Sequence, residues 1–207
     1  MRSHIIGIAG PSSSGKTELA KQLAARLPGT AVVSLDSYYR GMDEVPLAER
    51  KKVNFDRPDA LDWELLHDHL QAILDGNAFD EPVYSFADYA RTRQTRRIEP
   101  SEFVIVEGLF VLYWPELRAI LDTKVYVETD PRVCFERRLR RDVAERGRSP
   151  ASVREQYERT VRPSAEWFVY PTRKHADLIV SGEEPLSSSM QAVMQVLRRA
   201  SAAAGGR

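Results

Sequence analysis

Short apolar runs alternate with longer segments of helical period along this 207-residue chain. The runs are rich in valine and isoleucine and apolar at successive positions, which is typical of strands buried on both faces of a sheet. They cover residues 5–9, 31–35, 103–106, 124–127 and 177–180. Because helical segments separate these strands, the pattern predicts an α/β fold with one five-stranded parallel sheet flanked by helices.

The helical segments are bounded by recognisable start and stop signals. In residues 60–74 an apolar stripe precedes Gly76, and in 132–145 the pair Asp130-Pro131 caps the start while Gly147 follows the end. Three further helices are predicted over residues 16–26, 152–161 (ending before Pro163) and 186–200. We therefore expect a single domain over residues 1–200 and a disordered tail over 201–207.

Charge and cysteine content exclude several classes of protein. The 30 basic and 30 acidic side chains cancel, so no overall field favours nucleic acid or an anionic membrane. Cys134 is the only cysteine, which excludes an intrachain disulfide and predicts a small buried apolar residue. No apolar stretch approaches the ~20 residues of a membrane span, and the run at residues 4–9 is too short for a signal peptide. We expect a cytoplasmic protein with no nucleic-acid or membrane partner.

A phosphate-binding motif lies between the first strand and the first helix. Residues 10–17 match G-x-x-x-x-G-K-[ST], the P-loop pattern. Its predicted cofactor-binding residues are Gly10, Ser12, Ser13, Ser14, Gly15, Lys16 and Thr17. Glycine lets backbone N–H groups surround the β-phosphate, the lysine reaches the β- and γ-phosphates, and the threonine hydroxyl binds Mg²⁺. The motif predicts ATP and Mg²⁺ as cofactors, and no N-K-x-D guanine signature follows the fourth strand, which favours a small-molecule kinase over a GTPase.

Two carboxylates follow predicted strands. Asp36 comes after the second strand and Glu107 after the third, and ligands of parallel α/β sheets lie beyond the carboxyl ends of the strands. Asp36 is the predicted catalytic residue, accepting or orienting a substrate hydroxyl or holding a metal-bound water. Glu107 occupies the place of the second metal ligand of P-loop enzymes. The alternative is that each is a solvated strand-end or capping acid.

Several sequence blocks together resemble the uridine/cytidine kinase family. The similarity covers nearly the whole ordered chain and rests on the P-loop and on the blocks 35–39, 54–60, 82–91, 106–108 and 137–157. It implies transfer of phosphate from ATP, or GTP as an alternative donor, to the 5′-hydroxyl of a pyrimidine ribonucleoside. A small nucleoside-binding insertion, an arginine-bearing lid and a homotetramer are also implied.

The resemblance also assigns site residues. Asp36, Glu107 and Thr17 are implied near the metal, and Asp56 with Arg138 at the ribose hydroxyls. The base pocket is implied to consist of Phe55, Tyr84, Phe86, Tyr89 and Arg148, with Tyr39 and Gln156 nearby. The side-chain chemistry agrees, because a carboxylate accepts from ribose hydroxyls and aromatic rings stack on bases. Core packing is the alternative for Phe86.

Arginines are dense between residues 137 and 148. Arg138 and Arg141 are three apart on a helix and can converge on one anion. Arg146 lies in a connection that can close over ATP, so Lys16, Arg141 and Arg146 join Asp36 as predicted catalytic residues. Arg137 and Arg140 are expected on a solvated face paired with Glu136, Asp142 and Glu145, and the basic residues 91–97 on a solvated loop.

Two alternatives remain open at this point. Another P-loop kinase, similar to phosphoribulokinase or pantothenate kinase, shares the phosphate loop but not the aromatic base pocket. A regulator that has lost catalysis is disfavoured because Lys16, Asp36 and Glu107 are present. One block departs from the family pattern, with Ser85 and Tyr89 where aspartate and histidine are usual. Since histidine can present either a donor or an acceptor, its replacement by tyrosine predicts a preference for cytidine over uridine.

Overall fold

The predicted parallel sheet is the centre of the molecule. The structure is a computed structural model that describes residues 2–42, 44–50 and 53–205. Five strands pair in the order β2-β5-β1-β6-β7, all parallel, as expected. They are β1 (His4–Ala9), β2 (Thr30–Ser34), β5 (Phe103–Glu107), β6 (Thr123–Glu128) and β7 (Leu178–Ser181). The sequence prediction is therefore confirmed, with boundaries displaced by at most one residue.

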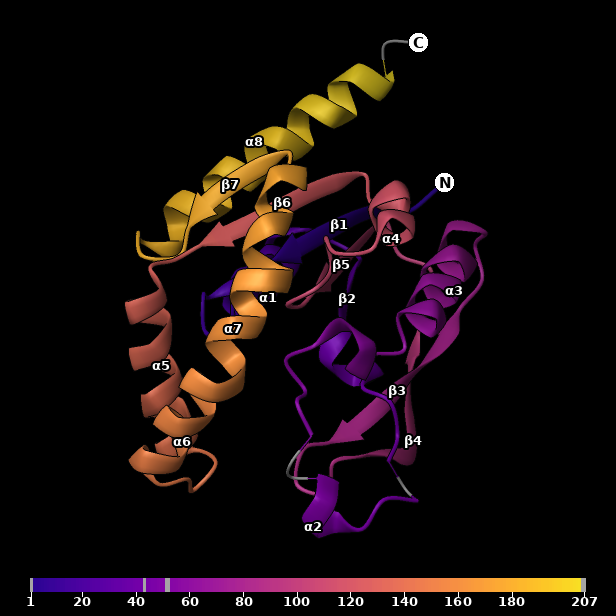
Figure 1. The fold of residues 1–207 in the computed structure, drawn as a ribbon. Coiled ribbons are helices and arrows are strands. Elements are labelled where there is room, and N and C mark those ends of the chain that lie inside the picture. Colours follow the sequence, from indigo (N-terminus) through magenta and orange to yellow (C-terminus); the bar gives the residue numbers. More distant parts are fainter. Residues whose placement is uncertain (1, 43, 51–52, 206–207) are drawn as a thin grey trace.

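Helices cover both faces of the sheet. Alternate residues of a strand point to opposite faces, so a strand that is apolar at successive positions buries side chains on both. Ile5 and Ala9 of β1 pack into a core with α3 (Trp63–Leu74) and α4 (Pro115–Ile120). Ile6 and Ile8 pack into a second core with α1 (Lys16–Arg26) and α8 (Leu186–Gly205). All four of these β1 residues are fully buried. Figure 1 shows the strands running between these helices. No helix in the described ranges is long and apolar enough to cross a bilayer.

A β-hairpin extends the chain between α3 and β5 and was not predicted as strands. It consists of β3 (Phe79–Ser85) and β4 (Ala90–Ile98), paired antiparallel, and lies beside α3 in Figure 1. The short elements α2 (Leu47–Arg50) and η2 (Pro58–Ala60) precede α3. The basic run 91–97 is thus strand β4, and the expectation of a solvated loop is wrong for Arg91 and Arg96. Arg96 Nε donates to the buried Glu81 at 2.7 Å and its Nη2 to the Val32 carbonyl, which attaches the hairpin to β2.

The helical region after α5 (Pro131–Ala144) is longer than predicted. After α6 (Pro150–Gln156) it continues without a break through η3 (Tyr157–Val161), α7 (Arg162–Ser164), η4 (Ala165–Val169) and η5 (Tyr170–His175). The prediction that helix ends before Pro163 is wrong. A proline ring clashes with the carbonyl four residues earlier in an α-helix. Here η3 and η4 are π-helical, and Arg162 N–H reaches the Tyr157 carbonyl five residues back, so a wider turn accommodates the proline.

The last helix also extends further than expected. Helix α8 runs to Gly205 rather than ending near residue 200. Three consecutive alanines at 202–204, the residues of highest helix propensity, account for the extension. Residues 206–207 of the predicted tail lie outside the described residues.

Candidate active site

The phosphate loop has the backbone geometry that its glycines permit. A Cβ on Gly10 would lie 2.7 Å from the Val127 carbonyl, so no side chain fits there. Gly15, with φ 99°, caps the start of α1, and a left-handed φ of this kind favours glycine. The Ser14 carbonyl accepts from Thr129 Oγ1 at 3.1 Å, which ties the loop to the end of β6. Lys16 Nζ donates to the Pro11 carbonyl at 3.4 Å, across the mouth of the loop.

Glu107 is held beside the start of α1 by two hydroxyls. Thr17 Oγ1 donates to Glu107 Oε2 and Ser34 Oγ to Oε1, both at 3.1 Å. Burial raises the pKa of the Glu107 carboxyl, Lys16 opposes that shift, and Asp36 adds to it. Asp36 lies in the 3₁₀ turn η1 (Leu35–Tyr38) that follows β2, two residues after Ser34, which pairs with Glu107 in the sheet. The predicted residues Lys16, Thr17, Asp36 and Glu107 are brought together at the carboxyl ends of adjacent strands.

The oxygen donors of this corner suit Mg²⁺. Magnesium prefers hard oxygen ligands and keeps several waters and substrate phosphates rather than a cage made only of protein side chains. Thr17 and Glu107 supply such oxygens. Among the described residues there is no group of three or more His, Cys, Asp or Glu side chains able to enclose a metal. The two side-chain oxygens of Thr17 and Glu107 fit a metal held jointly by the protein and a nucleotide.

Arg138 joins three predicted segments. Its Nη1 donates to Ser12 Oγ of the phosphate loop at 3.0 Å and lies 4.0 Å from Asp56, and its Nη2 donates to Gln156 Oε1 at 3.2 Å. The Arg138 side chain is only 8 % exposed. Burial raises the pKa of Asp56, Arg138 lowers it, and Asp36 raises it further. Arg148 also donates to Gln156. The residues expected around the ribose thus lie next to the phosphate loop.

The four aromatic residues of the predicted base pocket form one cluster with Tyr39, which was predicted nearby. Tyr39 contacts the rings of Phe55, Tyr84 and Phe86 at centroid distances of 5.5, 5.3 and 6.3 Å. Tyr89 stacks on Phe55 at 5.3 Å. Phe86 is 49 % exposed, so core packing does not explain it, whereas Tyr39 is buried beneath the cluster. Arg146 lies 5.6 Å from the Phe86 ring centroid and brings the lid connection to this cluster.

A buried hydroxyl in this cluster has no hydrogen-bond partner among the described residues: Tyr84 Oη. Burial, followed by the nearby Tyr89, raises the pKa of Tyr84 to about 12. Tyr84 is therefore protonated at neutral pH, and its hydroxyl is free both to donate and to accept. An unpaired buried polar atom of this kind is normally satisfied by water or a ligand.

Sequence reasoning did not predict the contacts that Asp142, Arg91 and Asp62 make beside the site. Asp142 is fully buried and contacts two arginines of α5 and two of the lid connection, which are Arg138, Arg141, Arg146 and Arg148. Its expected pairing with Arg137 and Arg140 is therefore wrong. Arg137 instead donates to the Gly182 carbonyl at 2.9 Å. Arg91 donates to the Tyr39 carbonyl at 2.8 Å and lies 3.0 Å from Asp62, which fixes the turn carrying Asp36. Spacing on α5 could have found Asp142, because Arg138 and Arg146 are each four residues from it.

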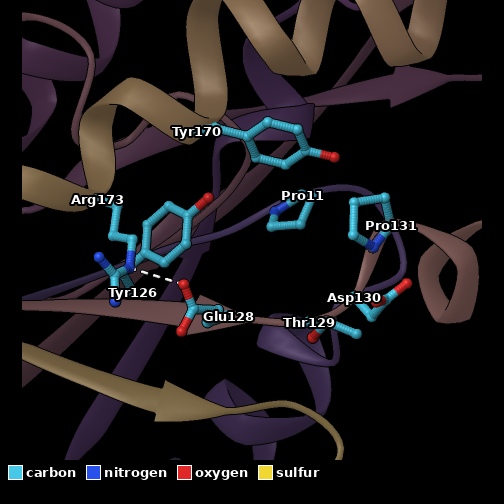
Figure 2. Close-up of a pocket in the computed structure, with 8 residues that line it drawn as sticks. All are labelled: Pro11, Tyr126, Glu128, Thr129, Asp130, Pro131, Tyr170 and Arg173. Carbon is cyan, nitrogen blue, oxygen red and sulfur yellow. Dashed lines mark ion pairs between the residues drawn. The ribbon is translucent and has the colours of Figure 1, made fainter.

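A separate cavity of about 310 Å³ lies beside the phosphate loop. Figure 2 shows the rings of Tyr126 and Tyr170 near Pro11, and the Arg173–Glu128 ion pair (2.7 Å) at one end. None of the site residues predicted from the sequence lines this cavity. It touches the loop only through Pro11, so it is distinct from the cluster around Asp36 and Arg138.

The five-stranded parallel sheet carries a phosphate loop, two acids at strand ends and a group of converging arginines. This combination defines a P-loop kinase fold. The chain belongs to the phosphoribulokinase / uridine kinase family, whose model matches residues 5–184. The family resemblance, the fold class and the assignment as a phosphotransferase are confirmed. ATP binding is implied by the family.

The relatives support the same family. A uridine kinase from Chloroflexus aurantiacus is 46 % identical over 190 residues, covering 90 % of this chain and 91 % of that protein. Phosphoribulokinase from Rhodobacter spheroides has a TM-score of 0.67 at 16 % identity, covering 89 % of this chain and 74 % of its own. D-glycerate 3-kinase from Cryptococcus neoformans has a TM-score of 0.65 at 19 % identity, with coverages of 89 % and 88 %. The two solved structures share the fold alone.

Proposed function

We propose that this protein transfers the γ-phosphoryl group of ATP to the 5′-hydroxyl of uridine and cytidine. The observation that carries the proposal is the aromatic cluster of Tyr39, Phe55, Tyr84, Phe86 and Tyr89. Asp56, next to Phe55 in the chain, lies 4.0 Å from Arg138, which contacts Ser12 of the phosphate loop. Exposed ring faces next to an unpaired hydroxyl suit a planar polar base. The 46 % identical relative named as a uridine kinase supports the same substrate class.

The site residues have distinct roles in this proposal. Asp36 accepts the hydrogen bond of the 5′-hydroxyl and orients it, while Lys16, Arg141 and Arg146 bind the phosphates. Asp56 and Arg138 hold the ribose hydroxyls. Thr17 and Glu107, with Asp36, provide the oxygens around Mg²⁺, which neutralises phosphate charge when bound. Arg148, Gln156 and the aromatic residues surround the base.

A panel of acceptors tests the reaction. Purified protein is incubated with Mg²⁺ and ATP or GTP and with uridine, cytidine, ribulose 5-phosphate, pantothenate or D-glycerate. Products are resolved by chromatography. We expect nucleoside 5′-monophosphates from the two pyrimidine nucleosides and little turnover of the other acceptors. Preferred turnover of a sugar phosphate would favour a phosphoribulokinase-like enzyme, and absence of all turnover would favour a nucleotide-binding regulator.

Tyr89 makes cytidine the better substrate in this proposal. Tyr89 is half-buried, has φ 52° and lies near the unpaired Tyr84 hydroxyl, which can accept its proton. When the Tyr89 hydroxyl donates to Tyr84, its oxygen faces the base as a hydrogen-bond acceptor. It then matches the 4-amino donor of cytosine but not the 4-oxo acceptor of uracil. A mismatched buried polar pair costs a factor of up to ~10⁴ in kcat/KM.

The ratio of kcat/KM for cytidine and uridine tests this preference in three proteins. We expect wild type to favour cytidine, Tyr89→His to move the ratio toward unity, and Tyr89→Phe, which lacks only the hydroxyl, to lose discrimination. Equal wild-type values, or a ratio unchanged by Tyr89→His, contradict the assignment.

A homo-oligomer, tetrameric by the family resemblance, is also part of the proposal. Trp167 on η4 is 76 % exposed, and a large exposed apolar side chain is suited to a subunit contact. Light scattering on wild type and Trp167→Glu tests this. A monomeric wild type at micromolar concentration contradicts it.

A further inference from the structure

Asp142 is a buried carboxylate for which the proposed reaction has no direct use. Its side chain is 0 % exposed, and it lies on α5 facing the arginines. Asp142 Oδ1 accepts from Arg141 Nε and Nη2 at 3.0 and 2.9 Å and lies 3.6 Å from Arg146 Nη1. Asp142 Oδ2 lies 3.7 Å from Arg138 Nε and 3.6 Å from Arg148 Nη1. One carboxylate is therefore shared by four guanidinium groups.

These four arginines reach both halves of the site. Arg138 contacts Ser12 of the phosphate loop and lies near Asp56, and Arg146 lies over Phe86. The backbone N–H of Arg148 donates to the Asp142 carbonyl at 3.1 Å, so the residue also fixes the turn that connects α5 to α6. Through these arginines Asp142 is connected to the nucleotide side, the nucleoside side and the lid connection.

Half of the carboxylate is not hydrogen-bonded. Neither Asp142 Oδ2 nor Arg138 Nε has a hydrogen-bond partner among the described residues, although both are buried. The distance between them, 3.7 Å, exceeds hydrogen-bond range by a few tenths of an ångström. Arg138 and Asp142 lie on the same helix, so a small rotation of the Arg138 side chain would close this gap. Apo active-site hydrogen bonds are often long and tighten when the ligand binds.

We propose that Asp142 is a positioning residue: it aligns Arg141 and Arg146 for the triphosphate and holds Arg138 and Arg148 on the nucleoside side. Without it the four like charges repel one another, and the guanidinium groups spread from the phosphate-binding geometry. A misplacement of about 1 Å in such groups costs up to ~10²-fold in activity. The inference rests on the proposed function only in naming ATP as the ligand.

The direction in which the affinity for ATP changes distinguishes positioning by Asp142 from a simple effect of its charge. Simple charge balance predicts that Asp142→Asn, which adds one net positive charge, binds ATP more tightly. Positioning predicts weaker binding. By calorimetric titration with Mg²⁺ we expect the Kd for ATP to rise at least 10-fold, while that for AMP, which lacks the outer phosphates, changes less than three-fold. Unchanged or tighter ATP binding, or an equal loss for AMP, overturns the proposal.

A matched control and a second variant separate positioning from stability. Glu145→Gln removes an exposed charge three residues along and should change ATP affinity less than two-fold. Irreversibly unfolded protein lowers the binding stoichiometry but not the Kd, and reversible unfolding raises the Kd for ATP and for AMP by the same factor. Asp142→Glu retains the charge and moves the carboxylate by one methylene, so it avoids four unpaired arginines. We expect it to weaken ATP binding at least three-fold, and wild-type affinity in this variant overturns the proposal. If wild type does not bind ATP, the proposed function fails instead.

Discussion

Gly182 follows β7, and replacement by alanine should displace the phosphate loop. A Cβ at this position would lie 2.1 Å from the Ser14 carbonyl oxygen and 2.2 Å from Thr129 Oγ1. Real Cβ contacts are essentially never shorter than 3.0 Å, so the loop backbone must retreat by roughly 1 Å. Thr129 also holds the Ser14 carbonyl through its hydroxyl, so the same movement breaks the bond between β6 and the loop.

We expect this displacement to lower the catalytic efficiency with ATP. A shift of about 1 Å in the phosphate-binding backbone lowers kcat/KM for ATP by about 10²-fold, or ~2.7 kcal/mol. The KM for uridine should stay within a few-fold, because the aromatic cluster does not contact Gly182. Overpacking also costs about 1–3 kcal/mol in stability, so the assay is performed on protein whose folding has been verified by thermal unfolding.

Gly76→Ala is the matched control. Gly76 has φ 79° and no atom within 4 Å of an added Cβ. The change should cost about 1–2 kcal/mol of backbone strain and leave kcat/KM for ATP unchanged. Wild-type kinetics in folded Gly182→Ala would refute the claim that this contact sets the position of the loop.

Three further predictions concern residues of different kinds. Asp36→Asn should lower kcat by at least ~10² and leave nucleoside affinity within a few-fold; near-normal kcat would remove Asp36 from the mechanism. Glu81→Ala leaves the half-exposed Arg96 without its buried partner and should cost about 1.5–3 kcal/mol in urea unfolding, whereas Glu99→Ala at an exposed pair should stay within ~0.5 kcal/mol. Burial raises the pKa of the Cys134 thiol to about 11, so at pH 8 only roughly 0.1 % of it is thiolate. A thiol reagent should therefore react slowly with the native protein and rapidly with the protein unfolded in urea. Fast reaction of the native protein would contradict this.

The parallel sheet could be predicted from sequence because its information is local. Ile5, Ile6, Ile8 and Ala9 of β1 are all fully buried, and an apolar run buried on both faces has few other structures open to it. The hairpin was missed for the opposite reason. Only Ala90 and Ile98 of β4 are buried, at its two ends, so the strand has no alternation of apolar and polar residues from which to recognise it.

The residues that form the site were easier to predict than the contacts between them. Residues 10–17 carry their own geometry, since a phosphate loop is formed by consecutive residues. The partners of an arginine come from distant segments: Arg138 meets Ser12 across 126 positions and Gln156 across 18. Charge spacing on a helix identifies candidate pairs but not which pair is buried. That choice depends on which helix face the fold covers, and here it selects Asp142, which is fully buried, over the exposed acids Glu136 and Glu145. Because burial makes an ionic contact expensive to break, the acid that sequence reasoning assigned to the solvent is the one whose loss should most disturb the arginines.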